Sequence, residues 1–171
     1  MRQLALAISP PPQPTLENFV PGANAELLAR LRELVSGKFP DSIIYLWGEA
    51  GSGRSHLLQA CAGAGLHVAD DVETLDDGRQ VELFVRINEA RQSGGAVLAA
   101  GNAPPAQLAL REDLKSRLAW GLVYQVKPLT DEERAVFLRG EAGRRGMRVA
   151  DDVIGDVQAV AGAGAQHAAV P

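Results

Sequence analysis

Residues 48–55, GEAGSGRS, have the spacing of a phosphate-binding loop, G-x-x-x-x-G-K-[ST], except that Arg54 stands at the lysine position. The glycines of this stretch let the backbone curl so that its N–H groups converge on an anion. A helix predicted to begin near Arg54 adds the partial positive charge of its N-terminus at the same point. Ser55 can offer a hydroxyl to Mg²⁺. The alternative is a glycine-rich turn between a strand and a helix, but the spacing favours a nucleotide site.

Arg54 changes what this loop is expected to do. Its guanidinium keeps the positive charge but is longer, planar and forked, so it is not equivalent to a lysine's point contact with the β- and γ-phosphates. The sequence therefore predicts a loop that holds a nucleotide, ADP or ATP with Mg²⁺, better than it hydrolyses one.

Two acidic residues, Asp70 and Asp71, follow the apolar run LHVA at 66–69. A carboxylate at the carboxyl end of a strand beside a phosphate loop can hold the water shell of Mg²⁺, and its neighbour can orient an attacking water. The alternative is a solvated turn after a strand. Together with the loop, the pair predicts a magnesium site formed by Ser55, Asp70 and Asp71.

The composition excludes several classes of protein. The 171 residues carry 17 basic and 21 acidic side chains, a net charge of −4, which disfavours a general polyanion binder. A single cysteine, Cys61, leaves no intramolecular disulfide and fits a reducing compartment. Because no apolar stretch is long enough for a membrane span and the N-terminus does not have the pattern of a secretory signal, we expect a cytoplasmic protein without membrane contact.

The elements that must position these residues alternate along the chain. Apolar runs that predict strands lie at 43–47, 66–69, 96–100 and 122–126. Helical patterns follow Asn24, an expected N-cap, and lie at 54–62, near 77–92 and near 112–119. A capping box, TDEE at 130–133, begins a helix to about Arg145. The alternation predicts an α/β doubly wound domain with a mainly parallel sheet of about four strands.

Four stretches resemble, in order, four boxes of the AAA+ module of the replication initiator DnaA: TLENFVPGANAELL, IYLWGEAGSGRSHLL, VADDVETL and DLKSRLAWGLVYQVKPLTDEE. They are more similar to those of Hda-like proteins, the small regulatory inactivators of DnaA, which also have Arg in the phosphate loop. The resemblance covers roughly residues 1–155. It implies four parts: a clamp-binding tail and Pro-rich linker at 1–14, an AAA+ core at 15–128, a partial helical lid at 129–160 and a disordered tail at 161–171.

By position, the resemblance implies which residues bind nucleotide. Phe19 and Val20 would lie against the adenine, and Asn102 would be the first sensor near the γ-phosphate. With the loop, the implied cofactor-binding residues are Phe19, Val20, Gly48, Gly51, Ser52, Gly53, Arg54, Ser55 and Asn102. Arg117 matches the arginine finger, a guanidinium offered to a neighbour's nucleotide; the alternative is a surface arginine on a short helix.

The N-terminal peptide QLALAI, residues 3–8, resembles the segment by which Hda-like proteins bind the sliding clamp. A glutamine followed by bulky apolar residues on a flexible stalk can anchor in a hydrophobic groove. The residues expected to contact the clamp are Gln3, Leu4, Leu6 and Ile8. A stray edge strand is the alternative.

The chain departs from the family pattern in two places. Only one helix fits between Ser55 and Asp70, so a strand at the sheet edge is missing, which leaves LHVA as the expected edge. The lid ends in an Ala/Gly-rich stretch, and no arginine follows Arg148 to act as a second sensor. Arg54 and the missing lid contact disfavour independent turnover of ATP.

The function that the resemblance implies is negative regulation of replication initiation. The protein would bind the sliding clamp and stimulate ATP hydrolysis by DnaA through Arg117, and so would activate a partner's catalysis. It would not bind specific DNA sequences, because no basic helix-turn-helix follows the AAA+ portion. A free-standing ATPase of the helicase-loader type and an inactive truncated relative are the alternatives, and a homo-oligomer is left open.

Overall fold

One sheet of four parallel strands organises the chain, in the order β2-β3-β1-β4. The computed structural model describes residues 12–38, 42–144 and 146. The strands are β1, Ile43–Trp47; β2, His67–Ala69; β3, Val97–Gly101; and β4, Leu122–Gln125. The expected doubly wound α/β fold is confirmed, as is the short strand β2 at the edge of the sheet.

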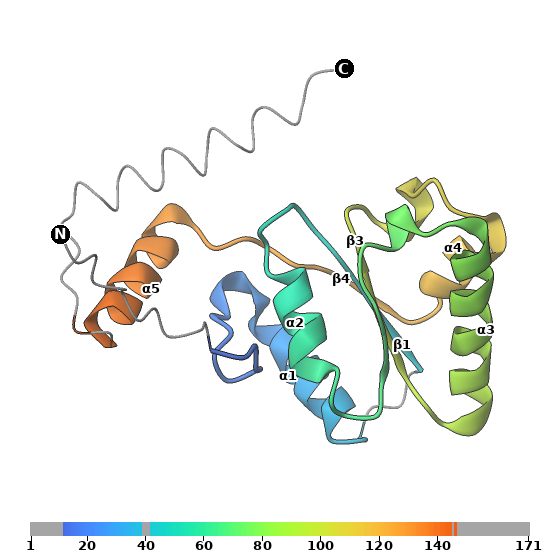
Figure 1. Cartoon of the computed structure of the whole chain (residues 1–171), viewed down its shortest axis with the longest axis horizontal. Coiled ribbons are helices and arrows are strands. Elements are labelled where there is room, and N and C mark those ends of the chain that lie inside the picture. The colour runs from blue at the N-terminus through green and yellow to red at the C-terminus, as the bar shows by residue number, and fades with distance from the viewer. Residues whose placement is uncertain (1–11, 39–41, 145, 147–171) are drawn as a thin grey trace, which may run out of the picture.

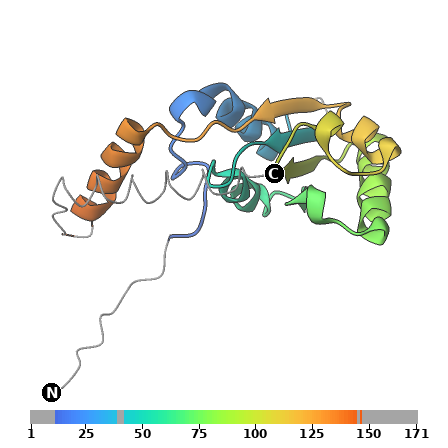
Figure 2. The same cartoon turned by 90° about the horizontal axis from the view of Figure 1, so that it is seen from above.

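Five α-helices are described: α1, Ala25–Val35; α2, Arg54–Cys61; α3, Asp77–Ser93; α4, Glu112–Leu118; and α5, Asp131–Arg144. Three short 3₁₀ turns are η1, Gly22–Asn24; η2, Val72–Thr74; and η3, Pro105–Gln107. Helices α1 and α2 cover one face of the sheet and α3 and α4 the other, while α5 lies at one end, beyond the N-terminal segment (Figures 1 and 2). None of these helices has the length and apolar character to cross a bilayer.

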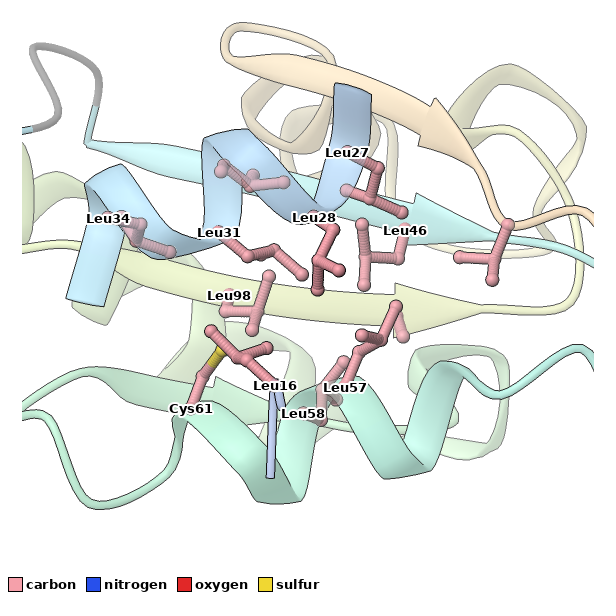
Figure 3. Close-up of a cluster of buried hydrophobic side chains, with 13 residues drawn as sticks. Leu16, Leu27, Leu28, Leu31, Leu34, Leu46, Leu57, Leu58, Cys61 and Leu98 are labelled. Carbon is pink, nitrogen blue, oxygen red and sulfur yellow. The ribbon is translucent and has the colours of Figure 1, made fainter. Parts of the chain in front are cut away.

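The two central strands supply side chains alternately to the two faces, as the pleat of a strand requires. Toward α1 and α2 they contribute Ile44, Leu46, Leu98 and Ala100, which join the leucines of both helices in one core (Figure 3). Toward α3 and α4 they contribute Ile43, Tyr45, Val97 and Ala99. We call these two halves the α1–α2 layer and the α3–α4 layer. Burial on both faces explains why β1 and β3 read as continuous apolar runs.

Of the predicted helix caps, the one that begins α5 is present and the one that begins α1 is wrong. The predicted capping box of α5 is present, since Thr130 N–H donates to Glu133 Oε2 and Glu133 N–H donates to Thr130 Oγ1. Asp76, which was not predicted as a cap, caps α3 by accepting a hydrogen bond from Arg79 N–H at Oδ1, at 2.8 Å. The expected cap at Asn24 is wrong: its side chain makes no capping bond in α1 and instead bonds the backbone of Lys127.

Several predicted segments fall outside the described residues. These are the clamp-binding residues Gln3, Leu4, Leu6 and Ile8, the part of the predicted lid at 147–160, and the tail at 161–171. Their predictions therefore remain predictions.

Candidate nucleotide site and a surface arginine

The phosphate loop leaves the carboxyl end of β1 and leads directly into α2, as its sequence predicts. Gly53 precedes the helix with φ +99°, in the left-handed region that favours glycine. A side chain at Gly48 would place its Cβ 2.5 Å from the carbonyl oxygen of Val126. Glycine is thus required at 48 by the close approach of the chain that follows β4, and at 53 by the backbone turn.

Two polar atoms of the loop are buried without a hydrogen-bond partner in the described part of the chain. They are the hydroxyl oxygen Oγ of Ser52 and the guanidinium nitrogen Nη1 of Arg54. An unpaired buried polar group costs free energy, so native proteins satisfy such groups or reserve them for a ligand. A donor and a hydroxyl left open beside a helix N-terminus fit the oxygens of a phosphate.

A cavity of about 190 Å³ lies beside this loop. Its walls come from the N-terminal segment, the phosphate loop, the chain after β4 and helix α5. The lining residues are Asn18, Phe19, Val20, Asn24, Gly51, Ser52, Gly53, His56, Lys127, Leu129, Arg134 and Phe137. Of the residues predicted to bind nucleotide, Phe19, Val20, Gly51, Ser52 and Gly53 meet here. The mixture of aromatic, apolar and cationic groups with loop N–H groups suits a nucleotide base joined to phosphates.

Phe19 is fixed against the loop by two contacts. A Cβ at Gly53 would lie 2.8 Å from Phe19 Cε2, so the ring packs directly on the glycine. The Phe19 ring also contacts the His56 ring, with centroids 5.5 Å apart. His56 Nε2 in turn lies 3.0 Å from the carbonyl oxygen of Thr15. His56, which has no metal-ligand spacing in the sequence, therefore ties the N-terminal segment to α2.

Two cations of this cavity, Lys127 and Arg134, were missed in the sequence. The side-chain amide of Asn24 bonds both backbone groups of Lys127: its Nδ2 donates to Lys127 O, and Lys127 N–H donates to its Oδ1, each at 2.8 Å. Arg134 Nη1 donates to Asp131 Oδ1 at 3.2 Å. Spacing could have placed Arg134 and Phe137 on one face of α5, but nothing local shows that this face meets the phosphate loop.

Asp70 and Asp71 follow the carboxyl end of β2, the edge strand, which β3 separates from β1. Asp71 has φ +45°, which is unusual for a side chain other than glycine, and its N–H donates to Asp70 Oδ1 at 2.9 Å. Asp71 is exposed and Asp70 half-buried. Within the described ranges no three His, Cys, Asp or Glu side chains gather as a metal cluster. The predicted magnesium site consists of two carboxylates, Asp70 and Asp71, and the exposed hydroxyl of Ser55. A measurement of Mg²⁺ binding would test it directly.

A third carboxylate, Glu73, stands closer to the centre of the sheet and was missed in the sequence. The backbone N–H of Asn102 donates to Glu73 Oε2 at 3.3 Å. Tyr45 lies next to it and donates its hydroxyl to Ala103 O at 2.8 Å. Burial raises the pKa of Tyr45, the charge of Glu73 raises it further, and the charge of Arg54 opposes them. Arg54 and Glu73 are therefore both within electrostatic reach of one hydroxyl at this edge.

Arg117, the predicted arginine finger, lies on α4 in the α3–α4 layer and lines no part of the cavity. Its Nε donates to Asn88 Oδ1 at 2.9 Å. Its Cζ lies 3.5 Å from the centroid of the Trp120 ring and 5.1 Å from that of Phe84. The guanidinium is half-buried and held by residues of its own subunit. It is thus organised at the surface rather than freely extended.

The order of the parallel strands and the loop between β1 and α2 are those of an α/β fold of the AAA+ type. No protein-family model matches the chain. Domain III of the replication initiation protein DnaA from Thermotoga maritima superposes with a TM-score of 0.68 and 22% identity, covering 84% of this chain and 79% of that one. AMPPCP-bound DnaA from Aquifex aeolicus gives 0.70 and 21%, over 86% of this chain and 59% of that one. This chain has the AAA+ fold of DnaA.

A third solved structure, protein NMB1076 from Neisseria meningitidis, is 34% identical over 75% of this chain and all of its own, with a TM-score of 0.43. The comparison of folds therefore rests on the DnaA structures. The chain spans about three fifths of the length of the two AMPPCP-bound DnaA structures that it matches.

Proposed function

We propose that the protein is a nucleotide-binding regulator that acts on the replication initiator DnaA. ADP or ATP would occupy the cavity beside the phosphate loop, with the base near Phe19 and Val20. Ser52 and Arg54 would receive the phosphate oxygens, and Ser55, Asp70 and Asp71 would face the accompanying Mg²⁺. The buried, unpaired Ser52 Oγ and Arg54 Nη1 support a phosphate ligand. The binding of AMPPCP by the DnaA structures that share this fold agrees with this placement.

Arg117 would then act on the nucleotide of another molecule. The observation that carries this proposal is its place in the α3–α4 layer, away from every residue that lines the cavity. Its side chain is half-buried and is held by Asn88 and Trp120. A guanidinium supplied in trans stabilises the charge of a phosphoryl-transfer transition state. The protein would bind the sliding clamp through Gln3, Leu4, Leu6 and Ile8 and stimulate ATP hydrolysis by DnaA, which switches initiation off.

The test is a reconstituted assay of ATP hydrolysis by DnaA in the presence of DNA-loaded clamp. The wild-type chain should stimulate hydrolysis, and Arg117→Ala should abolish the stimulation, since an arginine finger contributes about 10³-fold or more. Arg86→Ala is the matched control, because Arg86 also lies in the α3–α4 layer but is paired with Glu89. It should stimulate as the wild type does. Binding to the clamp should be the same for all three proteins.

Two results would contradict the proposal. One is stimulation that survives Arg117→Ala. The other is steady ATP turnover by this chain alone that is lost in Asp71→Ala, which would identify a free-standing ATPase. Replacement of Leu4 and Leu6 by alanine tests the clamp separately: stimulation should then require clamp concentrations far above those that suffice for the wild type.

A further inference from the structure

The ring of Trp120 lies beneath two guanidinium groups. Arg117 Cζ is 3.5 Å from the ring centroid and Arg91 Cζ is 4.5 Å from it. Trp is the aromatic side chain that attracts cations most strongly through the face of its ring. The indole therefore serves as the surface on which Arg117 rests, although 46% of Trp120 remains exposed.

The backbone fixes this ring in place. Helix α4 ends at Leu118, and the N–H of Trp120 donates to the carbonyl oxygen of Arg117 at 3.1 Å. The following residue, Gly121, packs so closely on β1 that a Cβ there would lie 2.0 Å from Ile43 O. The backbone of Trp120 is therefore held by the end of α4 on one side and by the packing of Gly121 on β1 on the other.

The contacts of Arg117 orient its charge without cancelling it. Within the described ranges neither Arg91 nor Arg117 forms an ion pair, and the polar partner of Arg117 is the neutral amide oxygen of Asn88. A carboxylate in place of the ring or of the amide would also hold the guanidinium, but would neutralise it. An aromatic ring and an amide instead restrict a long, flexible side chain while its positive potential stays available to a phosphate.

We propose that Trp120 is a positioning residue, which holds the guanidinium of Arg117 in the orientation that a partner's bound triphosphate requires. This inference rests on the proposed function of Arg117 and deepens it. The loss of the ring leaves Arg117 in the chain but spreads its side chain over many rotamers, so the transition state is reached less often. Binding to the initiator, which involves other contacts, is affected little.

The experiment compares maximal stimulation of DnaA hydrolysis with the concentration that gives half of it. Trp120→Ala should lower the maximum about tenfold, in keeping with the strength of a cation–π contact, and leave the half-stimulation concentration within about twofold. Trp120→Phe should restore most of the maximum because it keeps an aromatic face. Val85→Ala is the matched control and should match the wild type. Val85 is an apolar residue of α3 with an exposure of 44%, close to the 46% of Trp120.

Trp120→Leu covers the case in which Trp120→Ala unfolds, because it retains apolar bulk but has no ring to attract a cation. It should behave as Trp120→Ala is expected to. A nuclear magnetic resonance measurement adds a readout that does not depend on DnaA. The Nε–H signal of Arg117, shifted by the ring current in the wild type, should move toward its random-coil position in Trp120→Leu and stay shifted in Trp120→Phe.

The inference is overturned by full maximal stimulation in Trp120→Leu, by Trp120→Phe failing as badly as Trp120→Leu, or by a loss confined to the half-stimulation concentration, which would make Trp120 an ordinary contact residue. These outcomes are distinct from failure of the proposed function. If Arg117→Ala still stimulates, the proposed function fails. If Arg117→Ala abolishes stimulation while Trp120→Leu does not lower it, only the role of Trp120 fails.

Discussion

Two arginines on opposite faces of the sheet are held in contrasting ways. Arg54, at the start of α2, has its Nη1 buried without a partner among the described residues. Arg117, on α4, is bonded to Asn88 and rests on Trp120. An unsatisfied buried donor is the mark of a group that awaits a ligand inside its own molecule. A hydrogen-bonded and half-exposed guanidinium is the arrangement that the proposed role of Arg117 on a second molecule requires.

The two layers share the sheet but not their packing. Neighbouring residues of β1, such as Ile44 and Tyr45, are both fully buried and belong to different cores. A change in one layer therefore reaches the other only through the backbone of the strands. The comparison predicts that each layer can be damaged separately, with a loss of nucleotide binding on one side and of DnaA stimulation on the other.

The largest expected effects come from removing one leucine from each core. Leu57 of α2 and Leu114 of α4 are both fully buried. Alanine at either position should lower the free energy of unfolding by about 3–4 kcal/mol through lost burial and a cavity, as measured by urea denaturation. At a temperature where both variants are folded, only Leu57→Ala should weaken ADP binding, because its helix carries the phosphate loop. Equal loss of affinity in both would show that the layers are not independent.

A smaller loss is expected where α4 joins β4. Gly121→Ala introduces a Cβ that would lie 2.0 Å from the backbone oxygen of Ile43, and should cost about 2–3 kcal/mol of unfolding free energy through overpacking. Because Trp120 precedes this residue, DnaA stimulation should also fall. Gly140→Ala in α5 is the control, since nothing lies within 4 Å of its Cβ. It should leave stability equal or slightly higher, given the better helix propensity of alanine.

The sequence predicted those features that depend on neighbouring residues. The strands, the phosphate loop and the start of α2 follow from apolar runs and from glycine spacing, and the reciprocal bonds of Thr130 and Glu133 follow from a four-residue pattern. Glycine is required at Gly48 by a close contact and at Gly53 by its φ of +99°, while nucleotide binding by the loop remains a prediction.

What the sequence did not reveal depends on contacts between distant segments. Asn24 has the right type and position for a helix cap, but its side chain bonds the backbone of Lys127, 103 residues away. Glu73 and Arg134 have no local pattern that distinguishes them from surface residues. Arg117 and Trp120, whose side chains are in contact, lie only three residues apart in the sequence. The contacts of Arg117 with Phe84 and Asn88 exist only because α3 packs on α4.

A moderate effect confined to the nucleotide side is expected at Gly53. Gly53→Ala combines a strained φ of +99° with a Cβ 2.8 Å from Phe19 Cε2, so it should displace the ring that we propose lies against the base. We expect ADP affinity to fall about tenfold in a fluorescence titration. Gly37→Ala, after the end of α1, has a similar positive φ of +70° but nothing within 4 Å, and is the control for the general cost of such backbone strain. If both variants bind ADP equally, Phe19 does not contribute to the site.

The smallest expected effect is a change in how stability depends on pH, and it involves one buried ionisable group in each layer, the Cys61 thiol and the Tyr45 hydroxyl. Burial raises the pKa of the Cys61 thiol to about 11 in the α1–α2 layer, and burial also raises the pKa of Tyr45 in the α3–α4 layer. An unfolded chain loses the thiol proton at a lower pH than the folded one, so deprotonation favours unfolding. The stability that Cys61 contributes is complete below its unfolded pKa and is lost as pH rises toward about 11.

Between about pH 8 and pH 10 the wild type should therefore lose about 1 kcal/mol of unfolding free energy on account of this thiol. Cys61→Ala should remove the decline in unfolding free energy that is due to the thiol and keep the one due to Tyr45. Tyr45→Phe should remove the decline at higher pH that is due to the phenol and keep the one due to Cys61. Urea denaturation at a series of pH values measures both. We expect the two profiles to differ because the Cys61 side chain is completely buried in the core. If the wild type and Cys61→Ala have the same pH profile, the thiol ionises as readily in the folded core as in water, and the prediction is wrong.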